Sequence, residues 1–527
     1  MLKARLIRWI KWPLIVSAVG FVVGEKLWAF FSPSPALVIS EETTWITEPL
    51  APDGLPDYFQ ALLALEPRGI PAEINAAAAV WELIPTARSS DDVIDHSQAH
   101  LSAADRLPAS ERLVMPPPPP DDMEAEDARK VLESCARGAW RAADHPWLAR
   151  WLEDNAVALD RLAAGARREG WCPPRCLPAD QSPTKRFGKQ PIMLPLTLPV
   201  EDALLSMSGA LLARSMLRLG EGDAGGAWSD LDALLRYGDK ISDAPGTLIG
   251  RAVAMRLFSR ASRAVGRLIL DGHPDDMLLA DMQRSLRSSL DFPSLAEALD
   301  GHERLYALDA ITFRFANPSR PLPMSPFGRF PYRIFAADPN VPLREANKLL
   351  DTMVYAVGLP TRELRQGVWQ VVHDHLDSRG NAELRPRQWF EAWREVYSER
   401  LSGRTMKSFL PEVKTLLEDT DRTRAALVLA DTAAALERHR LATGAPPASL
   451  ADLVPTFLPA IPIDPLTDAS LGYRIADGRW TLWSGTDPEE DDVDELVVRG
   501  PAGHTPPESK SPYPSPTDPS PEAPSPP

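Results

Sequence analysis

Apolar residues recur every three or four positions along most of this chain, from about residue 123 to 315 and again from 341 to 442. That spacing is the period of an amphipathic α-helix. Glycines stand where such helices should end, as at Gly170, Gly220 and Gly272. We therefore predict helices over residues 55–65, 72–83, 125–142, 146–170, 200–219, 224–241, 248–271, 275–290, 293–315, 343–357, 364–376, 387–400 and 413–442.

The N-terminal end combines a basic start with an apolar run. Four cations fall within residues 1–11, residues 12–24 are uncharged and apolar, and the run resumes after Glu25 and Lys26. As a helix, residues 12–31 reach about 30 Å, the thickness of the hydrocarbon core of a bilayer. The positive flank predicts a cytoplasmic N-terminus and an extracytoplasmic body. We therefore expect a single-pass anchor in the inner (cytoplasmic) membrane, with a cleaved signal peptide as the alternative.

Near the C-terminal end the apolar period shortens from that of a helix to that of a strand. A long Ala-rich helix ends at Gly444, and alternating apolar residues then predict strands over residues 471–475 and 479–483. Asp477 and Gly478 between the strands suit a two-residue hairpin turn. The pattern predicts a small α+β module after the helical body.

Together these patterns predict a mainly α-helical protein with an N-terminal transmembrane helix, an α-helical extracytoplasmic body and the small C-terminal α+β module. Consecutive prolines at residues 116–120 are typical of a stiff spacer, and the Pro-rich end of the chain cannot bury enough apolar surface to fold. The expected segments are a cytoplasmic basic segment (1–11), the anchor (12–31), a mixed segment with a Pro-rich linker (32–122), a helical domain (123–315), an irregular connection (316–340), a helical region (341–421), the module (422–500) and a disordered tail (501–527).

The order of motifs in the module resembles the soluble end of the major pseudopilin of type II secretion systems. That family has a long helix followed by Gly-x-x-Pro, a short leucine-centred helix, Pro-x-Asp-Pro, two strands and a Ser-Gly-Pro-Asp-Gly-type acidic loop. The resemblance implies a pseudopilin-like fold for residues 422–500. The matching residues are Gly444, Pro447, Leu450, Leu453, Pro462, Asp464, Pro465, Tyr473, Ser484, Gly485, Asp487, Asp491 and Asp492.

Two departures from the pseudopilin pattern limit what the resemblance implies. About 390 residues separate the apolar N-terminal segment from the long helix, whereas the two are continuous in pilins, and no prepilin peptidase signal precedes Trp12. The acidic loop also reads Thr486-Asp487-Pro488 where the family has Gly-Pro-Asp-Gly. We therefore do not expect this chain to polymerise as a pilin.

Major pseudopilins bind calcium at the acidic loop. The resemblance therefore makes Asp487, Glu490, Asp491, Asp492 and Asp494 candidate calcium ligands. A dense set of carboxylates suits a hard cation that takes about six to eight oxygen ligands. A solvated acidic loop is the alternative interpretation, because the glycine chemistry of the family's loop is not preserved after Gly485.

Two further features indicate where the chain acts and what it does not bind. Residues 43–58, TTWITEPLAPDGLPDY, are similar to the start of a loose group of membrane-anchored bacterial envelope proteins that close with a pseudopilin-like end, and this similarity implies no activity. The chain has 57 Lys and Arg against 73 Asp and Glu, a net charge of −16. An acidic body repels phosphate backbones, so we expect no nucleic-acid partner.

Clusters of potential metal ligands or nucleophiles lack either the spacing or the further ligands that a site requires. They are His96 with His100, His373 with His375, Cys172 with Cys176, and His302 beside Glu303. Solvated side chains are the simpler interpretation of both histidine pairs. The two cysteines leave a local disulfide open, and His302 lacks the second histidine of a helical zinc protease motif.

No motif for an enzyme remains after these comparisons. We predict a membrane-anchored scaffold or interaction protein of the cell envelope that docks an envelope protein partner. The alternative is an envelope hydrolase whose residues are scattered beyond motif recognition. A deep pocket with convergent carboxylates or histidines of perturbed pKa would favour the hydrolase. Shallow grooves and an exposed apolar patch would favour the interaction protein.

Overall fold

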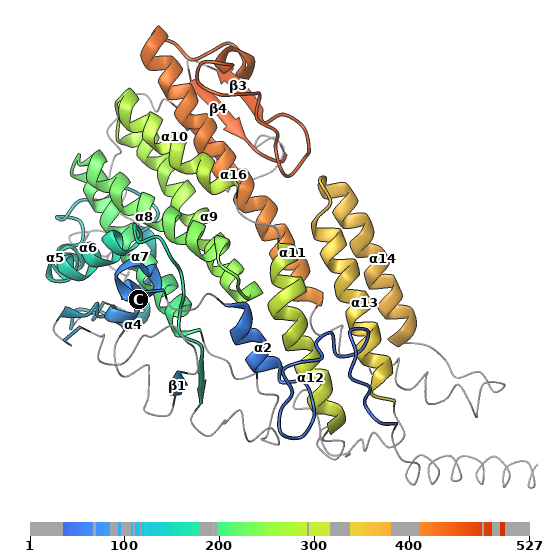
Figure 1. The fold of residues 1–527 in the computed structure, drawn as a ribbon. Helices are drawn as coiled ribbons and strands as arrows, with labels where there is room; N and C mark the ends of the chain where they lie inside the picture. Colours follow the sequence, from blue (N-terminus) through green and yellow to red (C-terminus); the bar gives the residue numbers. More distant parts are fainter. Residues whose placement is uncertain are drawn as a thin grey trace, which may run out of the picture.

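The computed structural model describes residues 35–66, 70–84, 93–95, 107–108, 111–115, 117–121, 123–178, 193, 198–291, 295–316, 338–380, 410–476, 479–486 and 496–500. Within these residues the fold is mainly helical (Figure 1). The helices are α2 (Tyr58–Leu65), η1 (Ala72–Ile74), α3 (Ala76–Leu83), α4 (Ala125–Cys135), α5 (Pro146–Asp154), α6 (Ala156–Gly165), α7 (Pro199–Gly220), α8 (Ala224–Asp243), α9 (Leu248–Asp271), α10 (Asp276–Leu290), α11 (Leu295–Ala298), η5 (Leu299–Glu303), α12 (Arg304–Ala316), α13 (Asn340–Val357), α14 (Arg362–Gly380), α16 (Leu410–Thr443) and η7 (Leu450–Leu453). The strands are β1 (Val93–Asp95), β2 (Cys176–Pro178), β3 (Gly472–Ala476), β4 (Arg479–Trp483) and β5 (Val497–Gly500).

A bundle of long helices forms the main body. Helix α9 packs against α7, α8 and α16, and α10 packs against α8 and α16 (Figure 1). Helices α7 and α8 are buried on all sides over part of their length, and the apolar core of the bundle includes Leu211, Leu234 and Leu268. The helix predicted over residues 248–271 is confirmed at both ends. Its first turn is capped by Thr247, whose hydroxyl oxygen accepts from the Gly250 N–H, and Gly272 follows its last residue.

Several predicted helices are shorter or broken in the structure, such as that over residues 72–83, which forms η1 and α3 on either side of Asn75. The helix expected over residues 146–170 is split into α5 and α6 at Asn155, whose side-chain amide donates to the Trp151 carbonyl at 2.7 Å. The helix expected over residues 125–142 ends with α4 at Cys135, because the chain beyond it places Trp140 against α7. The Trp140 indole N–H donates there to the Ala213 carbonyl at 3.0 Å. In the last two cases a side-chain N–H donates to a backbone carbonyl of a helix, and this hydrogen bond is not part of the regular backbone pattern of a helix.

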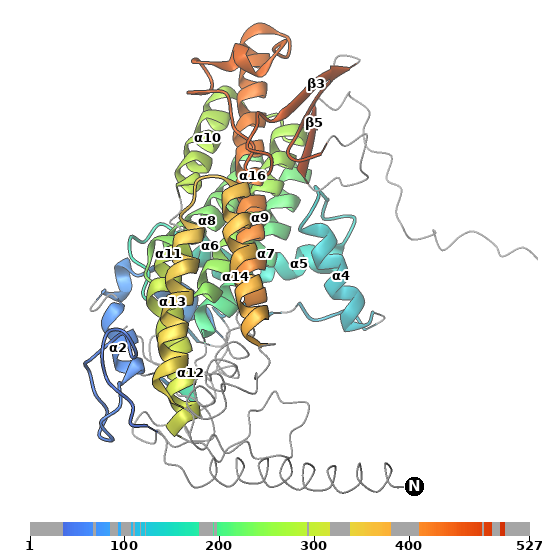
Figure 2. The same cartoon turned by 90° about the vertical axis from the view of Figure 1, so that its right-hand side faces the viewer.

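A second apolar core lies beside the main body. Helices α2, α12, α13 and α14 share it with the π-helix η5, and Tyr58, Leu308 and Leu350 are among its buried residues. Figure 2 shows α13 next to α14, with α2 at the outer edge of this group. The helix predicted over residues 293–315 is therefore three consecutive elements, α11, η5 and α12.

The C-terminal module contains a three-stranded antiparallel sheet with the order β3-β4-β5. The two strands predicted from alternation are confirmed, and β5 is an additional strand. The motif residues of the module contact one another. The Asp464 carboxylate accepts from the Ser484 hydroxyl at 2.5 Å and from the Gly485 N–H at 2.8 Å. The Tyr473 hydroxyl donates to the Pro447 carbonyl at 2.7 Å, which ties β3 to the turn after α16.

The module is packed onto the helical body. Trp480 of β4 is fully buried and belongs to the same apolar core as α7, α8 and α9. Polar contacts support this packing, since the Gln283 and Arg287 side chains of α10 both donate to the Phe457 carbonyl. Arg287 also pairs with Asp431 of α16 at 3.0 Å. The sheet and the helices therefore share one hydrophobic core.

Several predicted features lie outside the described residues. They are the anchor 12–31, the helix 387–400, the hairpin turn Asp477-Gly478 and the tail 501–527. In the described part of the chain, no helix combines the length and the hydropathy needed to cross a bilayer. The anchor is therefore still a prediction from the sequence.

Candidate functional site: an arginine-lined groove

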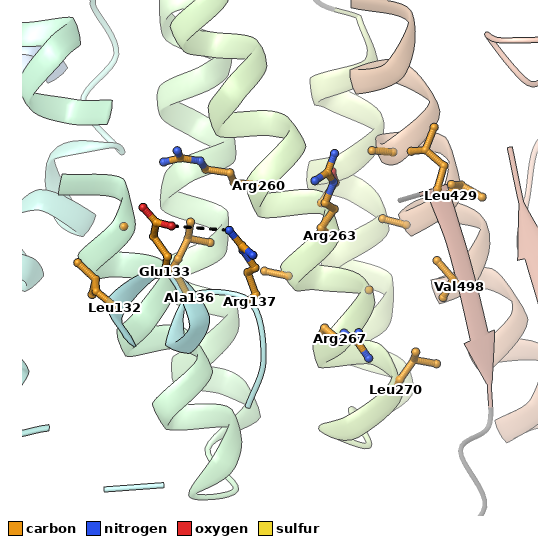
Figure 3. Close-up of a pocket in the computed structure, with 18 of the residues that line it drawn as sticks. Leu132, Glu133, Ala136, Arg137, Arg260, Arg263, Arg267, Leu270, Leu429 and Val498 are labelled. Atoms are coloured by element: carbon orange, nitrogen blue, oxygen red, sulfur yellow. Dashed lines mark ion pairs between the residues drawn. The ribbon is translucent and has the colours of Figure 1, made fainter. Parts of the chain in front are cut away.

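A groove of about 1230 Å³ lies between the helical body and the C-terminal sheet. Its walls come from α4, α7, α9, α16 and β5, together with Met115 (Figure 3). These elements are far apart in the sequence, so tertiary packing alone creates the groove. Its volume exceeds the roughly 300–1,000 Å³ typical of small-molecule sites.

The charged side chains that line the groove are almost all basic. They are six arginines and one glutamate, so the lining carries a formal charge of +5: Arg129, Arg137, Arg260, Arg263, Arg267, Arg499 and Glu133. The chain as a whole carries −16. The groove is therefore a concentrated positive region on an acidic protein, and such a region attracts anionic partners.

Helix α9 supplies the central row of cations. Arg260, Arg263 and Arg267 are spaced by three and four residues, so they lie on one face of the helix and are exposed. The opposite face of α9 is buried through residues such as Phe258 and Leu268. Figure 3 shows the three arginines between α4 on one side and Leu429 and Val498 on the other. The amphipathic pattern of α9 thus points this row into the groove.

Electrostatic repulsion among the arginines is only partly offset. Burial lowers the pKa of Arg260 below its usual value, and repulsion from Arg256 and Arg137 lowers it further, while Glu133 opposes this change. Glu133 lies 3.8 Å from the Arg137 guanidinium. Arg260 also donates to the Ser208 hydroxyl at 3.2 Å. Arg129 is offset by Glu126, to which its guanidinium donates at 2.7 Å.

Apolar and small residues form the remaining surface of the groove. Leu132, Leu205, Leu212, Leu270, Leu429 and Val498 contribute aliphatic side chains. A Cβ atom built at Gly209 or Gly266 would meet no heavy atom within 4 Å, so the space above both glycines is open. The groove thus offers aliphatic contact area beside its cations.

No family model, curated protein or solved structure matches this chain.

Few of the site residues predicted from the sequence belong to the part of the chain that the structure describes. The candidate calcium ligands Asp487, Glu490, Asp491, Asp492 and Asp494 lie outside the described residues, as do His96 and His100. In the parts of the chain that the structure describes, no cluster of three or more His, Cys, Asp or Glu side chains is arranged to hold a metal ion. Calcium binding at the acidic loop is therefore still an expectation from the resemblance.

The remaining candidates lie on separate elements. His373 is exposed on α14, which is helical as its sequence pattern predicted, and the side chain of His375 lies outside the described residues. Cys172 is buried, and the side chain of Cys176 is also outside them. The disulfide hypothesis therefore stays open.

His302 belongs to a buried network of charged side chains. The Arg175 guanidinium bonds to Glu66 and, at 3.1 Å, to Glu201, and His302 Nε2 lies 3.7 Å from Glu66. All four side chains are at most 7% exposed. Burial lowers the pKa of His302 and raises that of Glu201, where it outweighs the attraction of Arg175. Arg175 and His302 hold the pKa of Glu66 down against its burial.

This network joins α2, α7 and the π-helix η5, because Glu66 follows α2, Glu201 is in the first turn of α7 and His302 is in η5. Its burial shields it from solvent. We therefore interpret it as a structural link between the two cores, in which Arg175 bridges the two carboxylates. Among the described residues, Glu201 Oε2 and His302 Nε2 are buried without a hydrogen-bond partner.

Sequence reasoning missed the groove. The recurrence of arginine at positions 260, 263 and 267 on a predicted helix was visible, but an exposed cationic row is ordinarily a solvated helix face. The walls from α4, α16 and β5 that turn this face into a groove depend on contacts over more than a hundred residues of sequence.

Proposed function

We propose that this chain is an interaction protein of the cell envelope, held at the inner membrane by residues 12–31, and that it binds an anionic partner in the arginine-lined groove. The observation that carries the proposal is the formal charge of +5 in a concave surface of a chain with a net charge of −16. Charge complementarity of this kind steers the encounter with a partner and selects against partners of like charge.

The composition of the groove favours binding over catalysis. Arginine keeps its proton in proteins and does not serve as a general base. The one acidic side chain of the lining, Glu133, is paired with Arg137. Another convergent set of ionisable groups, around Arg175, is buried. The hydrolase alternative therefore gains no support from the described residues.

Site-specific photocrosslinking in living cells tests this proposal. A benzophenone amino acid replaces Gly266, where a side chain would project into open space in the groove. Gly367 on α14 provides the matched control, because it is also a helical glycine with open space around its Cβ, and it does not line the groove. We expect a discrete crosslinked product from position 266 that is absent from position 367, with the partner segment identified by mass spectrometry.

Absence of any product from position 266 would contradict the proposal. So would the same set of products from both positions, since that outcome indicates random encounters at the protein surface. Circular dichroism of the purified variants checks that both chains are folded before the results are compared.

A further inference from the structure

A strap of irregular chain, residues 36–48, lies along α13 at the N-terminal end of the described chain. Two asparagines of α13, seven residues apart, hold the strap by its backbone. The Asn340 side chain donates to the Ala36 carbonyl at 3.0 Å, and the Asn347 side chain donates to the Thr43 carbonyl at 2.9 Å. The strap is therefore fastened to the helix at its start and near its middle.

Further contacts fix the strap to the second core. The Arg304 guanidinium lies over the ring of Trp45, 5.3 Å from its centroid, and the Tyr58 hydroxyl of α2 donates to the Thr44 carbonyl at 3.2 Å. Thr43 and Thr44 are themselves buried. Because both the backbone and the side chains of the strap are engaged, the strap and the second core form one unit.

Only a short stretch of chain separates the strap from the predicted membrane anchor. The anchor ends at residue 31, and the strap is fastened at Ala36. Five residues of fully extended chain span at most about 17 Å, and the headgroup layer of one leaflet takes up about 5–8 Å of that distance. Ala36 can therefore lie no more than about 10 Å beyond the headgroups. The end of α13 that holds Ala36 must stay equally close to the membrane.

The tether, rather than charge, supplies this proximity. Glu41, Glu42 and Glu48 are exposed on the strap, and anionic headgroups repel them. We infer that the strap holds the second core against the phospholipid headgroups of the extracytoplasmic leaflet. This inference rests on the membrane anchor of the proposed function and adds a surface that faces the lipid.

This placement directs the groove away from the membrane. Figure 1 and Figure 2 both show the strap, in dark blue, at the end of the molecule opposite to the C-terminal sheet. Helix α16 connects the two ends, because Val413 belongs to the second core and Ala426 lines the groove. These two residues are about 20 Å apart along the helix axis. A partner therefore reaches the groove from the aqueous side.

Energy transfer to lipid headgroups tests the inference with the full-length chain in phosphatidylcholine vesicles. A fluorescent amino acid replaces Lys348, an exposed residue one position after Asn347, and the vesicles carry an acceptor dye on their headgroups. Ile463 provides the control position, because it is 58% exposed and belongs to the C-terminal module at the far end of α16. We expect strong energy transfer from position 348 and little from position 463.

A longer tether should remove this transfer without touching the fold. A spacer of about 20 Gly and Ser residues between positions 32 and 33 adds a mean span of about 25 Å. We expect it to abolish most of the transfer from position 348. The same spacer inserted after Gly503, in the Pro-rich tail, should leave the transfer unchanged.

Loosening the strap should have a similar effect. Asn340→Ala with Asn347→Ala removes both fastenings and should reduce the transfer from position 348. Gln370→Ala is the matched control, because this exposed amide on α14 donates to Asp374 of its own helix. Equal melting curves of the variants exclude unfolding as the cause.

Two outcomes would overturn the inference: equal transfer from positions 348 and 463, or transfer from position 348 that neither the N-terminal spacer nor the asparagine pair reduces. Flotation of the vesicles distinguishes this failure from failure of the proposed function. If the chain floats with the vesicles and still gives either outcome, the inference alone fails. If the chain does not float, the anchor of the proposed function fails as well.

Discussion

Asp239 on α8 is a residue whose ionisation opposes folding. Burial raises the pKa of its carboxyl group to about 6, and the nearby Asp243 contributes to the increase. In the unfolded chain the carboxyl loses its proton near pH 4. The folded state therefore holds a proton between about pH 4 and 6 that the unfolded state has released, and the folded protein loses stability as the pH rises through this window.

We predict that Asp239→Asn stabilises the protein at neutral pH. A shift of about two pKa units corresponds to about 3 kcal/mol, and the partial exposure of Asp239 reduces this to about 1–2 kcal/mol. At about pH 4 the wild-type carboxyl is protonated, so the substitution should change the free energy of unfolding little. Urea unfolding of the variant and the wild type, at neutral pH and at about pH 4, measures the change in the free energy of unfolding at each pH.

Asp154→Asn is the control for this prediction, because Asp154 is exposed and pairs with Arg150 one turn away. It should change the free energy of unfolding by less than about 0.5 kcal/mol at either pH. An Asp239→Asn protein that is no more stable than the wild type at neutral pH would show that the carboxylate is adequately solvated.

At the scale of elements, the contact between α8 and α9 depends on a glycine. A Cβ atom built at Gly238 would lie 2.5 Å from Cε1 of Phe258, which is fully buried. Gly238→Ala should therefore destabilise the protein by about 1–3 kcal/mol, because the two helices must move apart or the ring must shift. Gly266→Ala on α9 meets open space and should be stabilising by about 0.5–1 kcal/mol, the ordinary gain of alanine over glycine in a helix.

Thermal and urea unfolding of the two variants check this pair. The opposite signs are the informative result, since both substitutions add the same methyl group to a helix interior. Destabilisation by both would mean that the space above Gly266 is filled when the protein is in solution.

The elements themselves were largely predictable, because helical periodicity is a local property. Residues 248–271 are one example, and the strand over residues 479–483 is another. The break at Asn155 involves a local hydrogen bond to Trp151 that helical periodicity does not reveal. The π-helix at Leu299–Glu303 and the strand β5 were not predictable, since they depend on contacts with distant residues. The groove could not be predicted for the same reason: the arginines of α9 were visible, but the walls that enclose them were not.

At the scale of the whole molecule, the sequence predicts that the folded body lies outside the cytoplasm. Protease added to intact spheroplasts should therefore digest the body and spare the first ten residues or so, which the membrane protects. Tags at the two ends of the chain show which parts survive the digestion. A cytosolic protein that stays intact serves as the control for unbroken spheroplasts. A body that is cleaved only after lysis would place it in the cytoplasm and would remove the envelope from the proposed function.

The shared core also has a consequence for how the polypeptide is made. Synthesis runs from the N-terminus, so α9 and α10 emerge well before α16 and Trp480, against which they pack. At about 5–20 residues per second, the ribosome takes roughly 10–40 s to add the missing partners. During that interval the surfaces of α9 and α10 that pack on α16 have nothing to cover them, although α7 and α8 already cover other parts of these helices. A message truncated before α16 should therefore yield an aggregating product.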